Sequence, residues 1–413
     1  MFQIAATKSF APNFVFVNSS TYTDSSGQSN FCFDIKPDVC VYEKSKTCSG
    51  PTDVSCVDVI IEFKWNLYDD PFCDPYEAGE GDDMVLTFLR NTQNGVDTAG
   101  QITLYTSAQL GLQFRTCVYS VLIVHSYTRL IHWDRTGAIV PMPIYYNQDP
   151  ELTEFFRRYS RALPKFRGID TTVTLPNPKE VALARRSLEA VADVDIIKFT
   201  VPVGNSQREY LTCAPIATPY TPPGHATRGF VAYDLERDMK VFVKDTWRVD
   251  LLGINREGET YELLHEAGVR NIAPYSTAGD IDDHRTVMHL YKDKLWACPT
   301  ACELVPHHHY RLVLDVIGES LTKFSSTYEM LRCVLDVLEC TYFLDILIYS
   351  FLTLRAAGHE DAFNAGVLHR DISVGNILIV NGQGLLINWD LSKQLNSPIP
   401  NDCIRQPTRT VST

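Results

Sequence analysis

The feature that most constrains the fold is the eight-residue segment HRDISVGN at residues 369–376. It fits the pattern H-R-D-x-x-x-x-N. In this pattern the aspartate can accept the proton of a substrate hydroxyl, and the asparagine five residues later can hold a metal ion. A match of this length at fixed spacing, directly after the apolar residues 366–368, has little chance of being accidental. Asp371 is therefore the candidate catalytic base, and Asn376 is a candidate metal ligand.

A glycine-containing segment lies far upstream of this loop. The residues GHATRGFV fit G-x-G-x-x-G-x-V, with Gly224, Gly229 and Val231 in the motif positions and Ala226 in place of the middle glycine. Such a turn between two strands lets backbone N–H groups approach the phosphates of ATP. Glycine-containing hairpin turns are also common without any ligand, so the segment is a candidate ATP-binding loop only in combination with other motifs.

The strand-like run VFVK ends at Lys244. A lysine pointing from such a strand into a cleft can pair with the α- and β-phosphates and with a helix carboxylate, whereas a lysine on a strand surface is the simpler alternative. The helical segment EGETYELLHEAG follows and supplies the carboxylate. We expect Glu257, because Tyr261 and Leu264 then share one packing face of the helix, and Glu259 is the alternative.

The segment LINWDLS follows the catalytic loop and carries Asn388, twelve residues after Asn376, where a metal-binding aspartate is expected. An amide oxygen can bind Mg²⁺ but brings no negative charge, so metal binding should be weaker. Asp390 lies two residues further on. In an extended backbone it would point the same way as residue 388 and could partly replace the missing carboxylate.

Several segments resemble the fungal-type protein kinase family: VAYDLERDMKVFVKDTWR, HHHYRLVLDVIGESL, GVLHRDISVGNILI and GLLINWDLSK, together with RLIHWDRTGAIV and RGID further upstream. The resemblance extends over roughly residues 30–410. It implies a bilobal protein-kinase fold that uses ATP and Mg²⁺ and acts on serine or threonine of a protein substrate. By position it implies Lys244 as phosphate anchor, Asp371 as base and Asn376 as metal ligand.

The chain departs from that family in three places. The family usually has Asp-Trp-Asp where this chain has Asn388-Trp-Asp390, and it continues beyond IRQPTRT into further C-lobe helices, so we expect an incomplete C-lobe. The run TYFLDILIYSFLTL at residues 341–354 is interpreted as an insertion. The alternative to an active kinase is therefore a pseudokinase, or a truncated non-catalytic fragment that binds nucleotide or protein.

The N-terminal half carries a second candidate site. Asp38 follows a proline, and Glu62 and Lys64 end the strand-like run VDVIIEFK, which gives the pattern P-D…(D/E)-x-K of nuclease-like domains. In that pattern the two carboxylates share a divalent cation and the lysine stabilises charge on phosphate. Gln101 and Tyr105 add a Q-x-x-x-Y helix. The alternative is a charged strand edge in an α/β regulatory domain.

The chain of 413 residues predicts two or three domains in an α+β protein. We expect an irregular segment 1–30, an α/β domain 31–165, a connector 166–210 and the kinase-like domain 211–413. Strands are predicted at 57–65, 83–90, 115–124 and 127–134, and helices at 99–112, 151–163 and 181–191.

The formal net charge of −13 argues against a protein that coats nucleic acid, so no nucleic-acid partner is expected unless the nuclease-like site is active. No signal peptide is recognisable, which predicts an intracellular protein of the cytoplasm or nucleus. The apolar run 341–354 is too short for a bilayer, so we expect no membrane association. The oligomeric state stays open.

Overall fold

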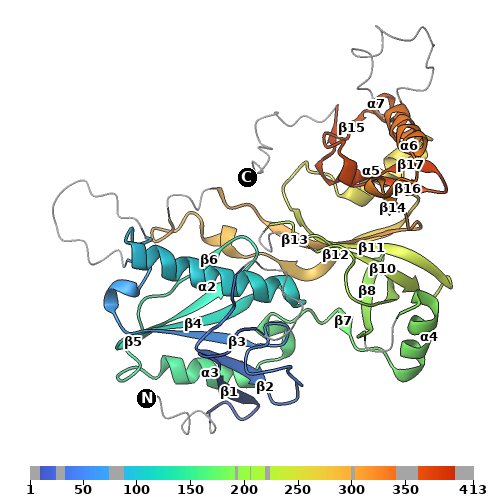
Figure 1. Ribbon diagram of the computed structural model, residues 1–413. Helices are drawn as coiled ribbons and strands as arrows, with labels where there is room; N and C mark the ends of the chain where they lie inside the picture. The colour runs from blue at the N-terminus through green and yellow to red at the C-terminus, as the bar shows by residue number, and fades with distance from the viewer. Residues whose placement is uncertain are drawn as a thin grey trace.

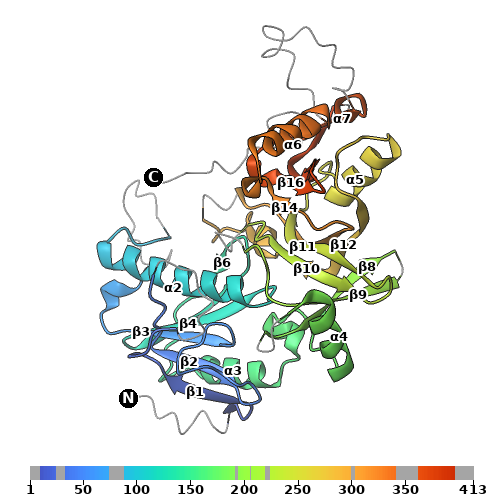
Figure 2. The same ribbon diagram turned by 45° about the vertical axis from the view of Figure 1, so that its right-hand side comes forward.

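The computed structural model describes residues 10–24, 33–73, 88–190, 194–204, 206–218, 224–298, 303–340 and 361–395. These residues form an α+β structure with a six-stranded sheet in the N-terminal half and a seven-stranded sheet in the C-terminal half. Figures 1 and 2 show the two sheets side by side, with the last helices and short strands stacked on the seven-stranded sheet. No helix in the described ranges is both long and apolar enough to cross a bilayer.

The first sheet has the order β1-β2-β3-β4-β5-β6, in which β3 and β4 are parallel and the other neighbours antiparallel. Helix α2 (Gln93–Leu112) makes the crossover between the two parallel strands and covers one face, and α3 (Glu151–Arg161) covers the other (Figure 1). The strands are β1 (Phe14–Asn18), β2 (Val39–Glu43), β3 (Val59–Lys64), β4 (Val118–Val124), β5 (Tyr127–Trp133) and β6 (Ala138–Ile139).

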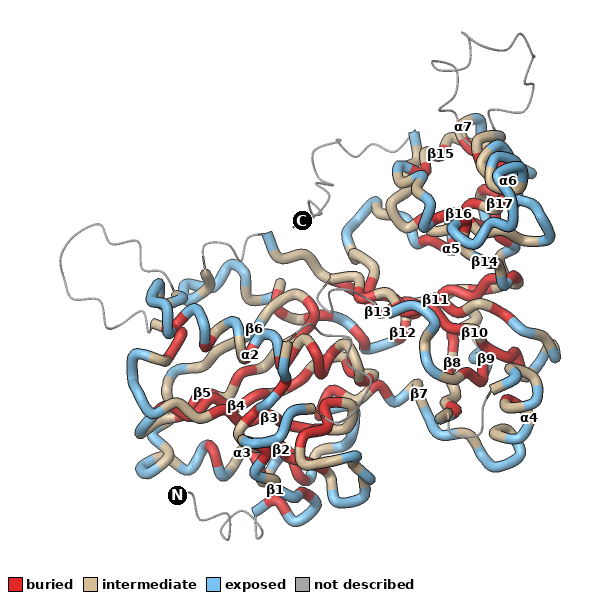
Figure 3. Tube along the Cα trace, in the orientation of Figure 1, coloured by how far each residue is buried: buried red, intermediate tan, exposed pale blue. Residues whose placement is uncertain are grey.

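Burial follows the alternation of side chains along the strands of this sheet. On β3, Ile60 packs in the cluster that contains Tyr105 of α2, whereas Ile61 packs in the cluster that contains Phe156 of α3. Figure 3 shows the buried residues concentrated in the sheet centres. The predicted irregular segment 1–30 is wrong at β1, because Phe14 is buried against Tyr159 of α3 with ring centroids 5.5 Å apart.

The second sheet is antiparallel throughout and has the order β12-β13-β11-β10-β9-β8-β7. Helix α4 (Pro178–Leu188) precedes the β8–β9 hairpin, and α5 (Glu257–Glu266) joins β11 to β12. The strands are β7 (Val173–Thr174), β8 (Ile197–Val203), β9 (Ser206–Thr212), β10 (Arg228–Asp234), β11 (Met239–Val249), β12 (Tyr275–Arg285) and β13 (His307–Leu314).

The interval 166–210, predicted as a connector, contains α4, β7, β8 and most of β9, so the structure differs from that prediction. Phe199 and Val201 of β8 and Tyr210 of β9 are fully buried beside Phe230 of β10. The proline, glycine and threonine residues at 163–180 predict the irregular segment that leads into the sheet, but they say nothing of the β8–β9 hairpin that follows. The second sheet therefore begins well before residue 211, at β7.

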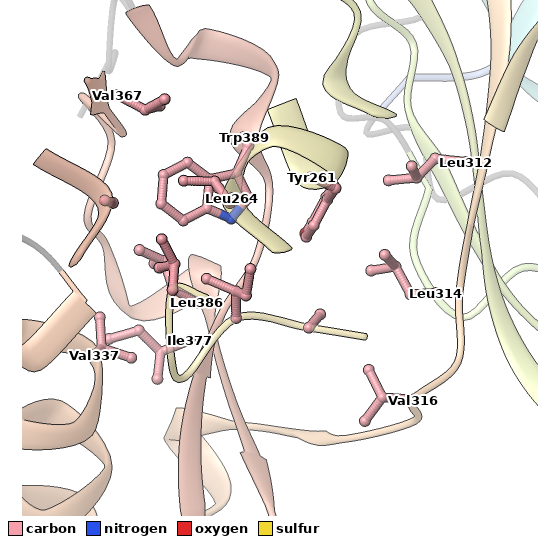
Figure 4. Packing of buried hydrophobic residues seen from close by; sticks show 14 of the residues in the cluster. Tyr261, Leu264, Leu312, Leu314, Val316, Val337, Val367, Ile377, Leu386 and Trp389 are labelled. Atoms are coloured by element: carbon pink, nitrogen blue, oxygen red, sulfur yellow. The ribbon is translucent and has the colours of Figure 1, made fainter. Parts of the chain in front are cut away.

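The C-terminal part packs on α5 and on the edge of the second sheet. Its core contains Trp389, Leu386, Ile377 and, from α5, Tyr261 and Leu264 (Figure 4). The elements are β14 (Glu319–Ser320), α6 (Thr327–Cys340), α7 (Asp361–Asn364), β15 (Val367–Leu368), β16 (Ile377–Val380), β17 (Gln383–Leu386) and β18 (Lys393–Gln394), with short 3₁₀ helices η6 (Val374–Asn376) and η7 (Trp389–Leu391). Further 3₁₀ helices are η1 (Leu67–Asp69), η2 (Pro164–Arg167), η3 (Met288–Tyr291) and η5 (Leu321–Lys323).

The structure contains most of the elements that the sequence predicts. The predicted strands at 57–65, 115–124 and 127–134 correspond to β3, β4 and β5, and the predicted helices correspond to α2, α3 and α4. The predicted strand 83–90 lies mostly outside the described residues, and its described end makes only a bridge between Leu89 and Phe72. The segment 341–354 and the residues after 395 also lie outside the described residues.

Candidate active site

The candidate active site is built around the ammonium group of Lys244, in the middle of β11. Its Nζ lies 2.7 Å from Oε2 of Glu257, the first residue of α5, and both side chains are buried. Glu259, the alternative partner, instead lies 3.7 Å from the exposed Arg256. Tyr261 is fully buried, as expected for a helix that turns Glu257 inwards.

The same ammonium group also holds the segment that follows β17. It donates a hydrogen bond to Oδ1 of Asn388 and lies 3.4 Å from Oδ2 of Asp390. Glu257 contributes a second link, because its Oε1 accepts a hydrogen bond of 3.0 Å from the backbone N–H of Trp389. Three elements far apart in the sequence thus meet at one buried lysine.

The electrostatics of the site keep Lys244 charged. Burial alone would lower its pKa, but the carboxylates of Asp390 and Glu257 outweigh burial and raise the pKa above its ordinary value. Burial raises the pKa of Glu257, and the ammonium of Lys244 opposes that shift. The two side chains therefore make a contact of 2.7 Å in a setting where neither has much access to water.

The catalytic loop is held by His369, a residue of the motif for which the sequence suggested no role. Its Nε2 lies 2.9 Å from the carbonyl oxygen of Ile387, and its Nδ1 accepts a hydrogen bond of 3.2 Å from the backbone N–H of Asp371. These partners require the neutral tautomer with the proton on Nε2, and burial lowers the pKa of His369 in agreement. His369 also packs edge-on against Trp389, with centroids 4.6 Å apart. It is a positioning residue for the loop.

Asn376 connects the two halves of the site. Its Nδ2 donates to the backbone oxygen of Asp371 at 2.7 Å and to the carboxylate of Asp371 at 3.0 Å. Its Oδ1 accepts a hydrogen bond of 3.1 Å from Nδ2 of Asn388. The candidate base is thereby joined to the candidate metal ligands through one buried amide.

These contacts test how well the residues fit a divalent cation. Oδ1 of Asn376, the atom that would bind a metal, faces the NH₂ group of Asn388, and a donor at that place does not suit a cation. In contrast, Oδ1 of Asp390 is buried and has no hydrogen-bond partner among the described residues. Asp390 thus fits Mg²⁺ as it lies, and Asn376 offers a suitable oxygen that the NH₂ group of Asn388 occupies. Asn388 itself fits poorly, because its oxygen accepts from Lys244 and its NH₂ group points at the site.

Asp390 reaches the site through a backbone conformation that differs from the predicted one. The prediction assumed an extended backbone, but Asn388 has the left-handed conformation with φ 69° and ψ 62°, and η7 begins immediately after it. Asparagine is among the residues that tolerate this conformation best. The turn brings the side chains of residues 388 and 390 to the same ammonium group.

The candidate ATP-binding loop is shorter than predicted. Gly224 and Ala226 lie before β10 with positive φ values of 77° and 42°, but Gly229 and Val231 lie inside β10, and Gly229 pairs with Lys244 on β11. A Cβ atom at position 229 would come within 2.8 Å of the Phe242 ring. A side chain at this position would therefore displace the Phe242 ring, and the turn itself is confined to residues before the strand.

The structure also brings together the polar residues of the nuclease-like motif. Lys64 donates to Glu62 at 2.9 Å and to Gln101 at 2.7 Å, and Gln101 donates to Glu62 at 2.8 Å and to Tyr105 at 3.0 Å. Asp38 accepts a hydrogen bond from the backbone of β3. Burial, followed by the charge of Asp38, raises the pKa of Glu62. Within the described part of the chain, Oε2 of Glu62 is buried without a partner.

Comparison with known proteins decides the family. Residues 90–346 and 350–411 match the family of fungal protein kinases. The chain belongs to this family. Its fold is kinase-like, as the sequence predicted, and the match begins in the N-terminal half, at the start of α2. No curated protein matches the chain. The comparison does not confirm the nuclease-like interpretation of residues 31–165, which stays a prediction.

The buried pair makes a stability prediction. Replacing Glu257 with Gln leaves the buried ammonium of Lys244 with Asp390 as its remaining carboxylate, so the free energy of unfolding should fall by about 3 kcal/mol. The matched variant Glu259→Gln removes an exposed pair and should change it by less than about 1 kcal/mol. Urea denaturation followed by circular dichroism measures both. Equal effects would show that Glu257 is not the partner that the fold depends on.

Proposed function

We propose that this fungal protein kinase transfers the γ-phosphoryl group of ATP to serine or threonine hydroxyls of a protein substrate. The observation that carries the proposal is the chain of contacts from Glu257 through Lys244 and Asn388 to Asn376 and Asp371. It supports one continuous site with a phosphate anchor at one end and a carboxylate base at the other.

In this proposal each residue has a separate task. Lys244, held by Glu257, binds the α- and β-phosphates of ATP. Asp371 accepts the proton of the attacking hydroxyl, and Asn376 fixes the direction of its carboxylate. Asn376 and Asp390 would hold Mg²⁺, which neutralises phosphate charge when it is bound. In this proposal the backbone N–H groups of residues 225–227 cover the phosphates.

The contacts of Asn388 favour a second candidate function, that of a pseudokinase which binds nucleotide or protein without catalysis. Asn388 brings no negative charge, and its amide hydrogen-bonds to both Lys244 and Asn376. A nucleotide-binding module needs the lysine but not the full metal-binding set. The distinction between the two candidates therefore lies in the metal dependence of the site.

The partnerless oxygen of Glu62 supports a third candidate, a metal-dependent phosphodiesterase in the N-terminal half. Asp38 and Glu62 would share the cation, and Lys64 would stabilise negative charge on the phosphate. This activity would be independent of the kinase site, since it uses the other sheet.

Phosphotransfer tests the proposed kinase directly. With Mg²⁺ and radiolabelled ATP, the wild-type chain should label a generic protein substrate, and Asp371→Asn should lower the rate about 10²- to 10⁴-fold because the general base is lost. Phosphoamino-acid analysis shows whether serine and threonine carry the label. Absence of transfer by the wild type, or an unchanged rate in Asp371→Asn, contradicts the proposal.

The charge at position 388 sets the metal dependence. In Asn388→Asp the restored carboxylate should strengthen Mg²⁺-ATP binding, so the thermal shift caused by Mg²⁺-ATP should exceed that of the wild type, since stabilisation grows as RT ln(1 + [L]/Kd). Asn147→Asp adds the same charge at an exposed position and should behave as the wild type. If Mg²⁺-ATP shifts the melting temperature equally in both variants, the missing charge at position 388 does not limit Mg²⁺-ATP binding.

Cleavage of nucleic acid tests the third candidate. Incubation with single- and double-stranded DNA and RNA in Mg²⁺ or Mn²⁺ should give cleavage that EDTA abolishes and that Lys64→Ala reduces about 10²-fold or more. Lys179→Ala, at an exposed position on α4, should leave it unchanged. If the wild type cleaves nothing, the cluster has a structural role.

A further inference from the structure

A buried arginine at the start of β10 joins the two halves of the molecule. One terminal nitrogen of Arg228 lies 2.8 Å from the carbonyl oxygen of Leu110, 2.9 Å from that of Gly111 and 2.8 Å from that of Gln113. These carbonyls belong to the end of α2, where the last four carbonyls of a helix lack partners within it and where positive charge is favourable. The guanidinium also lies 4.7 Å from the ring centroid of Phe114. Arg228 thus satisfies carbonyl groups at the C-terminal end of α2, a helix of the N-terminal half.

A second arginine reaches the same junction from the opposite direction. Arg135, shortly after β5, is buried, lies 5.3 Å from the ring centroid of Trp247 on β11 and donates at 3.2 Å to Leu110. Its backbone oxygen accepts a hydrogen bond of 2.9 Å from the N–H of Gly224. The first residue of the candidate ATP-binding loop is therefore attached to the N-terminal half.

The rest of this loop is attached to β11, close to Lys244. The carbonyl oxygen of His225 accepts hydrogen bonds from the N–H of Trp247 at 2.8 Å and from the hydroxyl of Thr246 at 3.1 Å. The hydroxyls of Thr227 and Thr246 lie 2.8 Å apart. Arg228 follows immediately and enters the end of α2. The loop is thus fixed on one side by the strand of the phosphate anchor and on the other by the N-terminal half.

A network of buried hydrogen bonds also holds β11, the strand that carries Lys244. Asp245, the neighbour of Lys244, accepts hydrogen bonds of 2.7 Å from Arg311 and from Nε2 of His309. Arg311 in turn donates at 2.7 Å to Asp170, which lies in the segment that enters the second sheet. The strand that carries the phosphate anchor is therefore also tied to that segment.

Asp170, His309 and His284 lie close enough together to suggest a metal site, but their contacts show a hydrogen-bond network. The Nδ1 atoms of the two histidines are 3.0 Å apart, and their rings lie within 3° of parallel with centroids 5.3 Å apart, so the nitrogen atoms face each other. Arg311 already donates to Oδ2 of Asp170 at 2.7 Å, and Nε2 of His309 lies 2.7 Å from Asp245, so these groups are engaged in hydrogen bonds and ion pairs.

From these contacts we infer that the N-terminal half positions the nucleotide-binding loop, with Arg228 and Arg135 as the positioning residues, and thereby sets the affinity for nucleotide. The inference rests on the proposed binding of ATP. A loop held in its binding conformation before the ligand arrives loses less entropy on binding. If a variant holds that conformation for only a tenth of the time, its apparent Kd rises about tenfold.

The test uses the full chain with Arg228→Met, which keeps much of the side-chain length but removes the donors. The matched control is Arg237→Met, which breaks ion pairs to Asp234 and Asp315 at the opposite end of β10. Calorimetric titration with Mg²⁺-ATP should give about a tenfold higher Kd for Arg228→Met and less than a twofold change for the control. Arg228→Lys keeps the positive charge and should recover part of the affinity.

Hydrogen–deuterium exchange without nucleotide separates this inference from the proposed function. Amides of residues 224–229 should exchange faster in Arg228→Met than in the wild type and the control, whether or not ATP binds. Unchanged exchange there overturns the positioning role, and so does an unchanged Kd when the wild type binds ATP. Failure of the wild type to bind ATP overturns the proposed function instead. If Arg228→Met does not fold, Arg228→Lys provides the comparison, with a smaller increase in exchange expected.

Discussion

The structure depends on one buried ammonium group. Lys244 lies in the centre of the second sheet, where an unpaired charge would cost several kcal/mol. Its partners come from α5 and from the segment after β17, so pairing this charge brings a strand, a helix and that segment into contact. The hydrophobic cluster around Tyr261, Leu264 and Trp389 then packs directly behind the polar contacts. Packing and charge pairing therefore select the same arrangement.

Charge balance explains why Asn388 fits this arrangement. Lys244 contributes one positive charge, and Glu257 and Asp390 contribute one negative charge each. An aspartate at position 388 would add another negative charge to a site with little water, which a bound cation would have to offset. With asparagine the uncharged amide instead hydrogen-bonds to both Lys244 and Asn376.

Local patterns in the sequence predicted the parts of the site that depend on local geometry. The position of Glu257 follows from helical spacing, and the pairing of Asp371 with Asn376 follows from the fixed spacing of the H-R-D-x-x-x-x-N motif. Asp390 was placed at the site through an assumed extended strand, whereas a left-handed residue and a 3₁₀ turn bring it there. The β8–β9 hairpin was missed because the turn-forming residues just before it dominated the interpretation. Arg228 and Arg135 gave no signal, because their partners are backbone carbonyls, which no residue pattern reveals.

Arg228 and Arg135 join the two halves, so the boundary between the sheets is not the boundary of the unit that surrounds the candidate ATP-binding loop. By sheet composition the molecule divides near residue 170, yet the family match begins at residue 90 and includes α2, the helix whose end Arg228 completes. Asp38, Glu62 and Lys64 lie before the match, whereas Gln101 and Tyr105 lie inside it. The family match therefore includes the helix that contacts the candidate ATP-binding loop, but it does not include the carboxylates of the second candidate site. The structural unit around the candidate ATP-binding loop thus includes part of the N-terminal half, because Gly224 and Arg228 bind backbone oxygens of that half.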